Sequence, residues 1–173
     1  MTSPLGQKML QKVSDLSKNA TMPARAIFKS QVRLDAGTQC SAFVRKFPAM
    51  IVDEPPELGG NDAGANPVEL LLSSLGTCQA IVYSLYANVM GIELESVTVD
   101  VKGQLDIRGL FGVDLSIPPG FQDISFETRI TSSADAATIQ ELSRVVEARC
   151  PTLDTLTRKV PVTGRLFLNG EAV

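Results

Sequence analysis

A long apolar helix, expected over residues 67–90, constrains this chain more than any other segment. Its start is marked by Asn66 as an N-cap, Pro67 at the first helical position and Glu69 as a capping-box partner. Gly91 supplies the stop signal, so the helix would be about 36 Å long at ~1.5 Å per residue. Apolar side chains cover more than one of its faces: Leu70, Leu71, Leu72, Leu75, Ile81, Val82, Leu85, Val89 and Met90. We therefore expect this helix at the buried centre of the fold.

The rest of the chain predicts strands and shorter helices around that segment. Alternating apolar residues and flanking turn residues predict strands over 25–34, 41–47, 49–52, 96–105, 126–130 and 162–168. Apolar residues at helical spacing predict one amphipathic helix over 9–16 and another over 133–149, which ends at Cys150-Pro151. Residues 53–67, dense in Pro, Gly, Asn and Asp, predict a loop long enough to be a functional element. This order of elements favours the α+β class.

The length of 173 residues, with 44% hydrophobic residues, predicts one domain with a core of ordinary size. We expect residues 1–24 to form an amino-terminal helical extension and residues 25–173 to form the domain itself. The amino terminus is too polar and lysine-rich for a secretory signal, and every long apolar stretch contains polar breaks. We therefore expect a cytoplasmic protein that does not associate with membranes.

Composition also excludes several kinds of chemistry. The chain has no histidine, which removes Ser-His-Asp and Cys-His catalysis and metal sites that need imidazole. Its net charge of −3, without a long run of like charge, argues against nucleic acid as a partner. The acidic residues Asp53, Glu54 and Glu57 have no cysteine or histidine partner nearby, and the glycines lack the spacing of a nucleotide-binding loop. We expect neither a metal nor a cofactor.

The remaining candidates for reactive groups are the three cysteines, Cys40, Cys78 and Cys150. They are too few for a disulfide scaffold and lack C-x-x-C spacing, so each is either a buried apolar residue or a working thiol. Cys78 falls inside the long helix, and Cys150 directly precedes a proline at a helix end. These two could meet and form a reversible disulfide, whereas we expect a structural role for Cys40, on a predicted strand.

A set of motifs around these cysteines resembles the OsmC/Ohr family of thiol-dependent hydroperoxide reductases. The motifs are the run NPVELLLSSLGTCQA, the preceding DEPPELGG and the later Cys150-Pro151-Thr152. The resemblance, over roughly residues 25 to 170, implies an α+β fold with antiparallel sheets around two long central helices. It further implies an intertwined homodimer with active sites at the subunit interface. Within them, Cys78 would be the peroxidatic cysteine and Cys150 the resolving one.

A peroxidatic cysteine needs a lowered pKa, and one this far inside a helix gains little from the helix dipole. In the family, an arginine from the amino-terminal strands supplies the positive charge. The best match here is Arg45, on the strand that leads to the DEP segment, and the alternative is Arg33, further upstream. For either arginine, a solvated position at a strand edge is the competing interpretation.

One departure from the family pattern concerns its carboxylate. In the family a glutamate directly follows the proline of the N-P motif and pairs with the arginine, but here that position is Val68. Glu69 follows one residue later, about 100° further around the helix, so a capping-box role competes with a role in the site. The displacement favours the broader OsmC-like branch over an Ohr-like peroxidase.

The leading functional hypothesis is a peroxidase that reduces organic hydroperoxides through a cycle of Cys78 and Cys150. Thiolate attack on the peroxide would give a sulfenic acid, which the second cysteine converts to a disulfide. A small dithiol or a protein thiol would then reduce that disulfide. Two alternatives are a non-catalytic dimer that binds an apolar ligand at the subunit interface and a different thiol-dependent transfer reaction.

Overall fold

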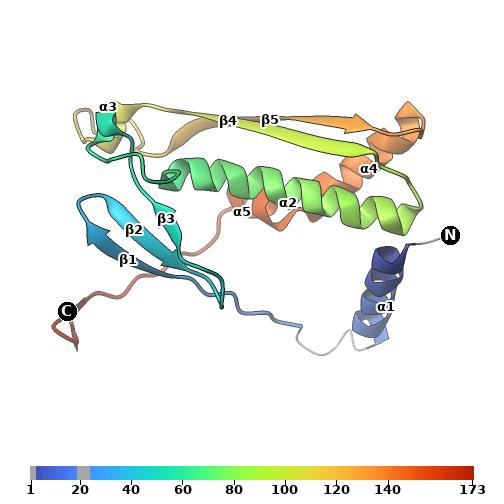
Figure 1. The fold of residues 1–173 in the computed structure, drawn as a ribbon, viewed down its shortest axis with the longest axis horizontal. Helices are drawn as coiled ribbons and strands as arrows, with labels where there is room; N and C mark the ends of the chain where they lie inside the picture. Colours follow the sequence, from blue (N-terminus) through green and yellow to red (C-terminus); the bar gives the residue numbers. More distant parts are fainter. Residues whose placement is uncertain (1–2, 19–23) are drawn as a thin grey trace.

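A computed structural model describes residues 3–18 and 24–173 of the chain. The hairpin of β4 and β5 covers α2, α4 lies along α2, and the three-stranded sheet lies below the amino-terminal half of α2 in the view of Figure 1. The elements in chain order are α1 (Pro4–Lys18), β1 (Gln31–Ala36), β2 (Gln39–Phe43), β3 (Met50–Val52), the 3-10 helix η1 (Pro56–Leu58), α2 (Pro67–Met90), β4 (Ser96–Leu105), α3 (Ile107–Leu110), β5 (Phe121–Thr131), α4 (Ala136–Arg149), α5 (Pro151–Thr157), β6 (Phe167–Leu168) and β7 (Glu171–Ala172). All paired strands are antiparallel, which confirms the α+β class.

The long helix α2 has the bounds that the sequence predicts. The Asn66 side chain accepts a hydrogen bond from the Glu69 N–H, and the Glu69 carboxylate accepts one from the Asn66 N–H, each at 2.9 Å. Gly91 ends the helix in the left-handed conformation at φ 72°, which glycine adopts without steric cost. Because both ends are fixed by local contacts, the register of every side chain on α2 is fixed as well.

The buried core lies between α2 and α4. Its members are Val82, Tyr83 and Ala87 from α2 with Leu142 and Val146 from α4. The Tyr83 hydroxyl donates a hydrogen bond to the Ser143 hydroxyl at 2.9 Å, so the polar end of the tyrosine also has a partner on α4. The two helices run antiparallel, which brings the middle of α2 to the carboxyl end of α4.

The same helix α2 is, among the described helices, the one with the length and apolar composition of a membrane span. The core helix of a soluble protein can have the same length and composition. Since α2 contacts β4, α4, α1 and α5, we describe it as the central helix of the fold. Only 22% of its most apolar 18-residue stretch is buried within one chain, however, so much of the surface of α2 is exposed.

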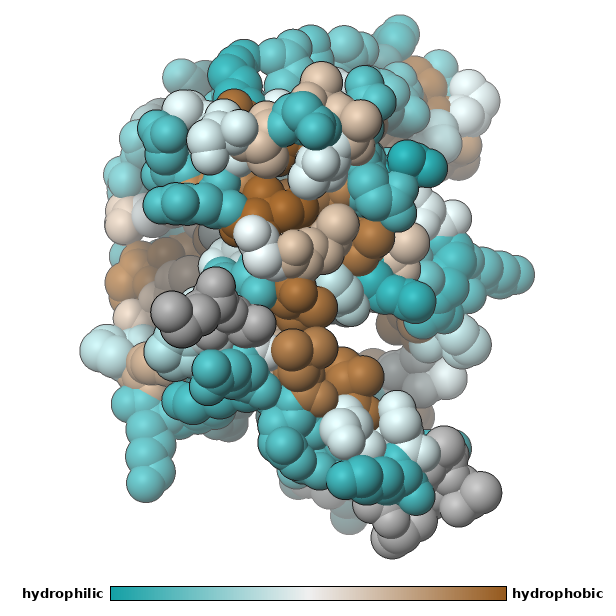
Figure 2. Space-filling view, turned by 90° about the vertical axis from the view of Figure 1, so that its right-hand side faces the viewer, coloured by the Kyte–Doolittle hydropathy of each residue, from teal (hydrophilic) through white to brown (hydrophobic). Residues whose placement is uncertain are grey.

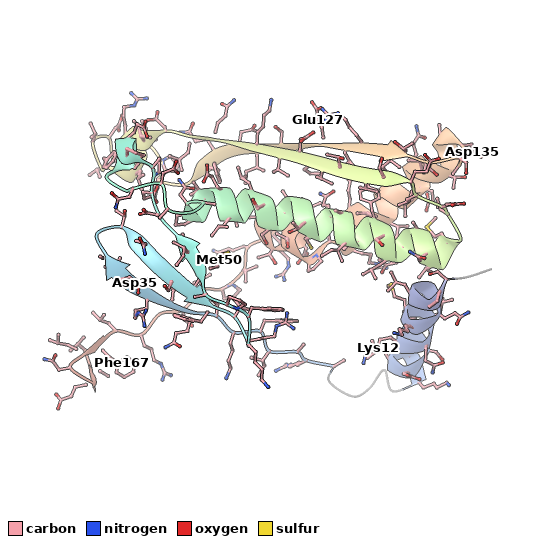
Figure 3. All side chains as sticks on the ribbon, in the orientation of Figure 1. Lys12, Asp35, Met50, Glu127, Asp135 and Phe167 are labelled. Atoms are coloured by element: carbon pink, nitrogen blue, oxygen red, sulfur yellow. The ribbon has the colours of Figure 1, made fainter. Side chains whose placement is uncertain are left out.

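The β4–β5 hairpin covers α2 with one of its faces. The residue pairs on that face are Val97 with Ile130, Val99 with Thr128 and Val101 with Phe126. Glu127 alternates with them and points away from α2 (Figure 3). The sequence predicts β4 with its observed bounds, but β5 begins at Phe121 rather than at residue 126. The earlier start follows from the pairing of Phe121 with Leu105, the last residue of β4.

Besides β5, three predicted strands were wrong in extent. Strand 25–34 is β1, which begins only at Gln31, because β2 ends at its partner Phe43 and leaves the preceding residues unpaired. Strand 41–47 stops at Phe43 because the chain turns at Arg45, whose φ is 53°. Strand 162–168 reduces to β6, which forms a short hairpin with β7.

The sequence analysis also missed two short helices, α3 and α5. Helix α4 ends at Arg149, as expected, but α5 follows at once with Cys150 as its N-cap and Pro151 at its first position. The proline that ends one helix thus begins the next, because the first helical position needs no N–H. Cys150 is therefore the single residue between α4 and α5.

The amino-terminal helix α1 extends beyond the predicted 9–16, and it packs near the carboxyl end of α2, where Ser3 hydrogen-bonds Asn88. Figure 2 shows a band of hydrophobic residues on this end of the molecule. An apolar groove there is lined by Met9, Leu10 and Val13 of α1, Tyr86 and Val89 of α2, and Val145 and Ala148 of α4. Residues 19–23, next to the expected boundary at residue 24, lie outside the described residues, so that boundary stays a prediction.

The loop before α2 is organised by one buried carboxylate, Asp53, which is 1% exposed. It accepts hydrogen bonds from the Thr38 hydroxyl at 2.6 Å and from the N–H groups of Glu54, Asn61 and Ala63 at 2.9, 3.0 and 3.3 Å. The Thr38 hydroxyl foremost, with these N–H groups, holds the pKa of Asp53 below its ordinary value. The loop thus closes around a charge rather than an apolar cluster.

We expect Asp53→Asn to lower the thermal midpoint of unfolding by a few degrees at pH 7, because an amide cannot accept all four hydrogen bonds. A lowered pKa in the folded state stabilises the fold above the unfolded pKa of about 3.9, and this stabilisation is lost as pH falls through the folded pKa. The difference between the two proteins should therefore narrow below about pH 4. Asp123→Asn, at an exposed carboxylate, is the control; an equal effect of both substitutions, or a difference independent of pH, would contradict the prediction.

Candidate active site

The structure brings Cys78 and Cys150 into direct contact. Cys78 lies on α2 and Cys150 lies between α4 and α5, and the Cys150 thiol donates a hydrogen bond to the Cys78 sulfur with 3.3 Å between the two sulfur atoms. Both are free thiols. Since a disulfide has a sulfur–sulfur distance of about 2.05 Å, a small approach of the side chains suffices to form the bond.

Cys78 is half-buried, and its surroundings favour the thiolate. Burial alone would raise the pKa of the Cys78 thiol, but hydrogen bonds from the Thr152 hydroxyl, the Thr152 backbone N–H and the Cys150 thiol bring it below its ordinary value. Thr152 is the second residue of α5. The donors that favour the Cys78 thiolate therefore come mainly from the start of the helix that Cys150 caps.

Cys150 has the opposite tendency. It is 0% exposed, and burial raises the pKa of its thiol, with the neighbouring Cys78 adding to the rise. The Leu153 N–H donates to the Cys150 sulfur at 3.5 Å and completes the N-cap of α5. Cys150 stands at the carboxyl end of α4 and the amino end of α5, so the helix dipoles oppose each other there and burial is the main cause of its raised pKa.

Neither predicted arginine interacts with Cys78 within the described part of the chain. We predicted Arg45 on a strand, but it lies in the turn after β2. Its guanidinium carbon lies 4.6 Å from the centroid of the Phe47 ring. Arg33 is exposed on β1 and forms an ion pair with Asp35 at 2.8 Å.

The role of Thr152 as a hydrogen-bond donor to Cys78 is what the sequence analysis missed. The available signal was Pro151 at the first position of a new helix, which places the next residue's N–H and side chain at a helix start.

A comparison with protein families gives one match that covers residues 59–164, and the matching model describes the OsmC-like proteins. The matched range includes α2, both cysteines of the pair and Thr152. This chain belongs to the OsmC-like protein family. A comparison with curated protein sequences gives no match.

Solved structures of OsmC-like proteins share the fold. An OsmC-like protein from Mycoplasma pneumoniae is similar with a TM-score of 0.66 at 22% identity, covering 76% of this chain and 87% of that one. An organic hydroperoxide resistance protein OsmC from Legionella pneumophila has a TM-score of 0.59 at 20% identity, and the match covers 77% of this chain and 92% of that one. An organic hydroperoxide resistance protein from Elizabethkingia anophelis, with thiocyanate bound, has a TM-score of 0.58 at 20% identity, and the match covers 79% of this chain and 91% of that one. At these identities the likeness establishes the fold.

At the position of the family's glutamate this OsmC-like protein has Val68, and the next residue, Glu69, takes part in the cap of α2. Val68 is partly exposed at the start of α2 and offers no acceptor. Glu69 is held by the capping box, and the Asn66 amide also donates to Glu54 at 3.1 Å. The structure thus gives Glu69 the capping-box role that the sequence analysis weighed against a role in the site.

The third cysteine of the OsmC-like protein, Cys40, lies on β2, paired with Leu34 on one side and Val52 on the other. Its thiol contacts the Thr38 carbonyl at 3.8 Å. Among residues 3–18 and 24–173, no group of three or more His, Cys, Asp or Glu side chains is arranged to hold a metal ion.

Proposed function

We propose that this OsmC-like protein is a thiol-dependent peroxidase that reduces organic hydroperoxides through Cys78 and Cys150. The observation that carries the proposal is the contact of two free thiols at 3.3 Å whose pKa values are shifted in opposite directions. The thiol with the lowered pKa suits the first attack, and its buried neighbour suits the second step.

The proposed cycle has three balanced steps. The Cys78 thiolate attacks the peroxide ROOH, the O–O bond breaks, and with one proton the products are ROH and a sulfenic acid on Cys78. The Cys150 sulfur then bonds to the Cys78 sulfur; its thiol proton leaves with the hydroxyl group of the sulfenic acid as water. A small dithiol or a protein dithiol finally reduces the disulfide by exchange and is itself oxidised.

An apolar cavity next to the cysteine pair supports an organic substrate. It has a volume of about 280 Å³ and lies between α2, β5 and α5. Leu75, one turn before Cys78 on α2, and Leu153, whose N–H contacts Cys150, contribute to its lining with Phe126. An alkyl or aryl group on the peroxide would be removed from water there, which favours its binding over that of hydrogen peroxide.

Oxidation by one equivalent of cumene hydroperoxide tests the cycle. We expect the loss of two thiols per chain and a disulfide between the peptides that contain Cys78 and Cys150, while Cys40 stays reduced and serves as an internal control. Dithiothreitol should restore both thiols and allow repeated turnover. Retention of all three thiols after oxidant treatment would contradict the proposal and favour a binding protein for apolar ligands.

We further propose that the protein acts as a homodimer in the cytoplasm. Its free reactive thiols suit a reducing compartment. Large apolar side chains are left exposed on the chain, among them Val32 at 61% and Leu34 at 64% on β1 and Ile81 at 60% on α2. A second copy that covers these residues would complete the surroundings of α2 and could bring a guanidinium to Cys78.

Sedimentation measures the assembly directly. We expect a dimer at micromolar concentration, with an interface of more than ~2,000 Å² that is rich in apolar side chains. Ile81→Asp should weaken the dimer, because it places a charge on the exposed apolar side of α2, whereas Lys102→Asp on the outer face of β4 should not. A folded monomer of the unaltered protein at micromolar concentration would contradict the dimer.

A further inference from the structure

Gln79, the residue after Cys78, is an unexplained polar group in the core. Its side chain is 0% exposed, yet neither its Oε1 nor its Nε2 atom has a hydrogen-bond partner among the described residues. Thr128 on β5 is half-buried, and its Oγ1 atom is likewise inaccessible and without a hydrogen-bond partner among the described residues. In native proteins roughly 90% or more of such buried groups are paired, because an unpaired one keeps the cost of leaving water without compensation.

The register of the fold places Gln79 and Thr128 on the sides of α2 and the hairpin that face each other. A Cβ atom added to Gly76 would lie 3.2 Å from the Val101 side chain and 3.5 Å from the Val99 carbonyl, so this part of α2 faces that part of β4. Gln79 is three residues after Gly76 and therefore its neighbour along one side of the helix. Thr128 is the direct partner of Val99 across the hairpin, on the sheet face that covers α2.

The nature of the three atoms limits what can bind them. They are the carbonyl oxygen and the NH2 group of an amide and one hydroxyl, all neutral, so they offer no charge to a metal ion or an anion. A second copy of the chain cannot reach them, because they are already closed off within one chain. Ser125, whose Oγ atom is also unpaired, lies on the opposite face of β5 and does not belong to the group.

We propose that Gln79 and Thr128 form an internal hydration site of one or two water molecules between α2 and β5. Water both donates and accepts hydrogen bonds, and a buried water molecule typically makes about three, which matches the three atoms. The site would tie the turn of α2 that carries Cys78 to the sheet through polar contacts. It does not depend on any reaction of the thiols.

Nuclear magnetic resonance of the wild-type protein tests the site directly. Rotating-frame cross-relaxation should connect the side-chain amide protons of Gln79 with a long-lived water molecule. Loss of the amide signals in Gln79→Met assigns them, and the cross-peak should disappear in Thr128→Val. Absence of the cross-peak in the wild-type protein would overturn the proposal.

A double-mutant cycle gives the second, independent measurement. With shared water, Gln79→Met and Thr128→Val should each lower the thermal midpoint by roughly 2 °C or more. The double variant should lose less than the sum, because no polar atom is then left unpaired. Gln140→Met and Thr98→Val, at exposed positions in a helix and a strand, should leave the midpoint unchanged. Two stabilising, additive substitutions at Gln79 and Thr128 would show dry, separate groups and overturn the proposal.

Discussion

Replacement of Cys78 by serine is expected to reduce the peroxide consumption of the protein to the uncatalysed background. Serine keeps the shape of the side chain but cannot form the thiolate that attacks the peroxide oxygen. Cys150→Ser should behave differently, since the first step remains available. It should consume one equivalent of peroxide per chain and then stop, with a sulfenic acid on Cys78. The two substitutions therefore separate the attacking thiol from the resolving thiol.

Mass spectrometry after one equivalent of cumene hydroperoxide, with dimedone present to trap sulfenic acid, measures this difference. We expect a dimedone adduct on Cys78 in Cys150→Ser and no adduct on Cys150 in Cys78→Ser. Cys40→Ser is the matched control, and it should retain full activity. An adduct on Cys150 in Cys78→Ser, formed at the wild-type rate, would exchange the two roles. The absence of any adduct in both variants would favour a protein that binds ligands without reducing them.

Replacement of Thr152 by valine is expected to slow the alkylation of Cys78 about 10-fold near neutral pH. Valine keeps the size of threonine but loses the hydroxyl that stabilises the thiolate, and a hydrogen bond to a charged group contributes about 1.5–3 kcal/mol. The pKa of Cys78 therefore rises, the fraction of thiolate at neutral pH falls, and the rate falls with it. Iodoacetamide labelling across a range of pH, followed for the Cys78 peptide alone, measures the effect.

Three further variants show which group stabilises the Cys78 thiolate. Thr152→Ser restores a hydroxyl and should restore most of the wild-type rate, which a purely structural effect of the valine would not predict. Arg45→Met tests the guanidinium suggested by the family resemblance, and Arg33→Met tests the alternative. A wild-type rate in Thr152→Val together with slow alkylation in Arg45→Met would assign the role to an arginine that reaches Cys78 across the subunit interface.

The sequence predicted the parts of the fold whose signals are local. Helix α2 carries its own start and stop signals, so both of its ends were predicted correctly, and the alternating valines of β4 fixed that strand in the same way. The extents of β1 and β6 could not be predicted, because a strand is only as long as its partner. Where β2 ends depends on a turn at Arg45 with positive φ, and arginine gives no signal for that conformation.

The candidate site was predictable only in part, for a related reason. The family motif marks both cysteines, but their contact is a property of how α4 lies along α2. Helix α5, which follows Cys150, has a weak local signal, a single proline, so the role of Thr152 was not predicted. Glu69 shows the converse: the local capping signal was sufficient to explain the residue, and it took precedence over the family pattern.

The apolar character of α2 has a consequence for the synthesis of the protein on the ribosome. The helix is complete at Met90, but α4, which forms the other half of its core, ends only at Arg149. These ends are about 60 residues apart, so at ~5–20 residues per second the helix waits about 3–12 s for its partner to be made. During that time an uncovered apolar helix is a substrate for chaperones and a site for aggregation. Slow synthesis between residues 90 and 149 would therefore reduce the yield of folded protein more than the same delay before residue 67.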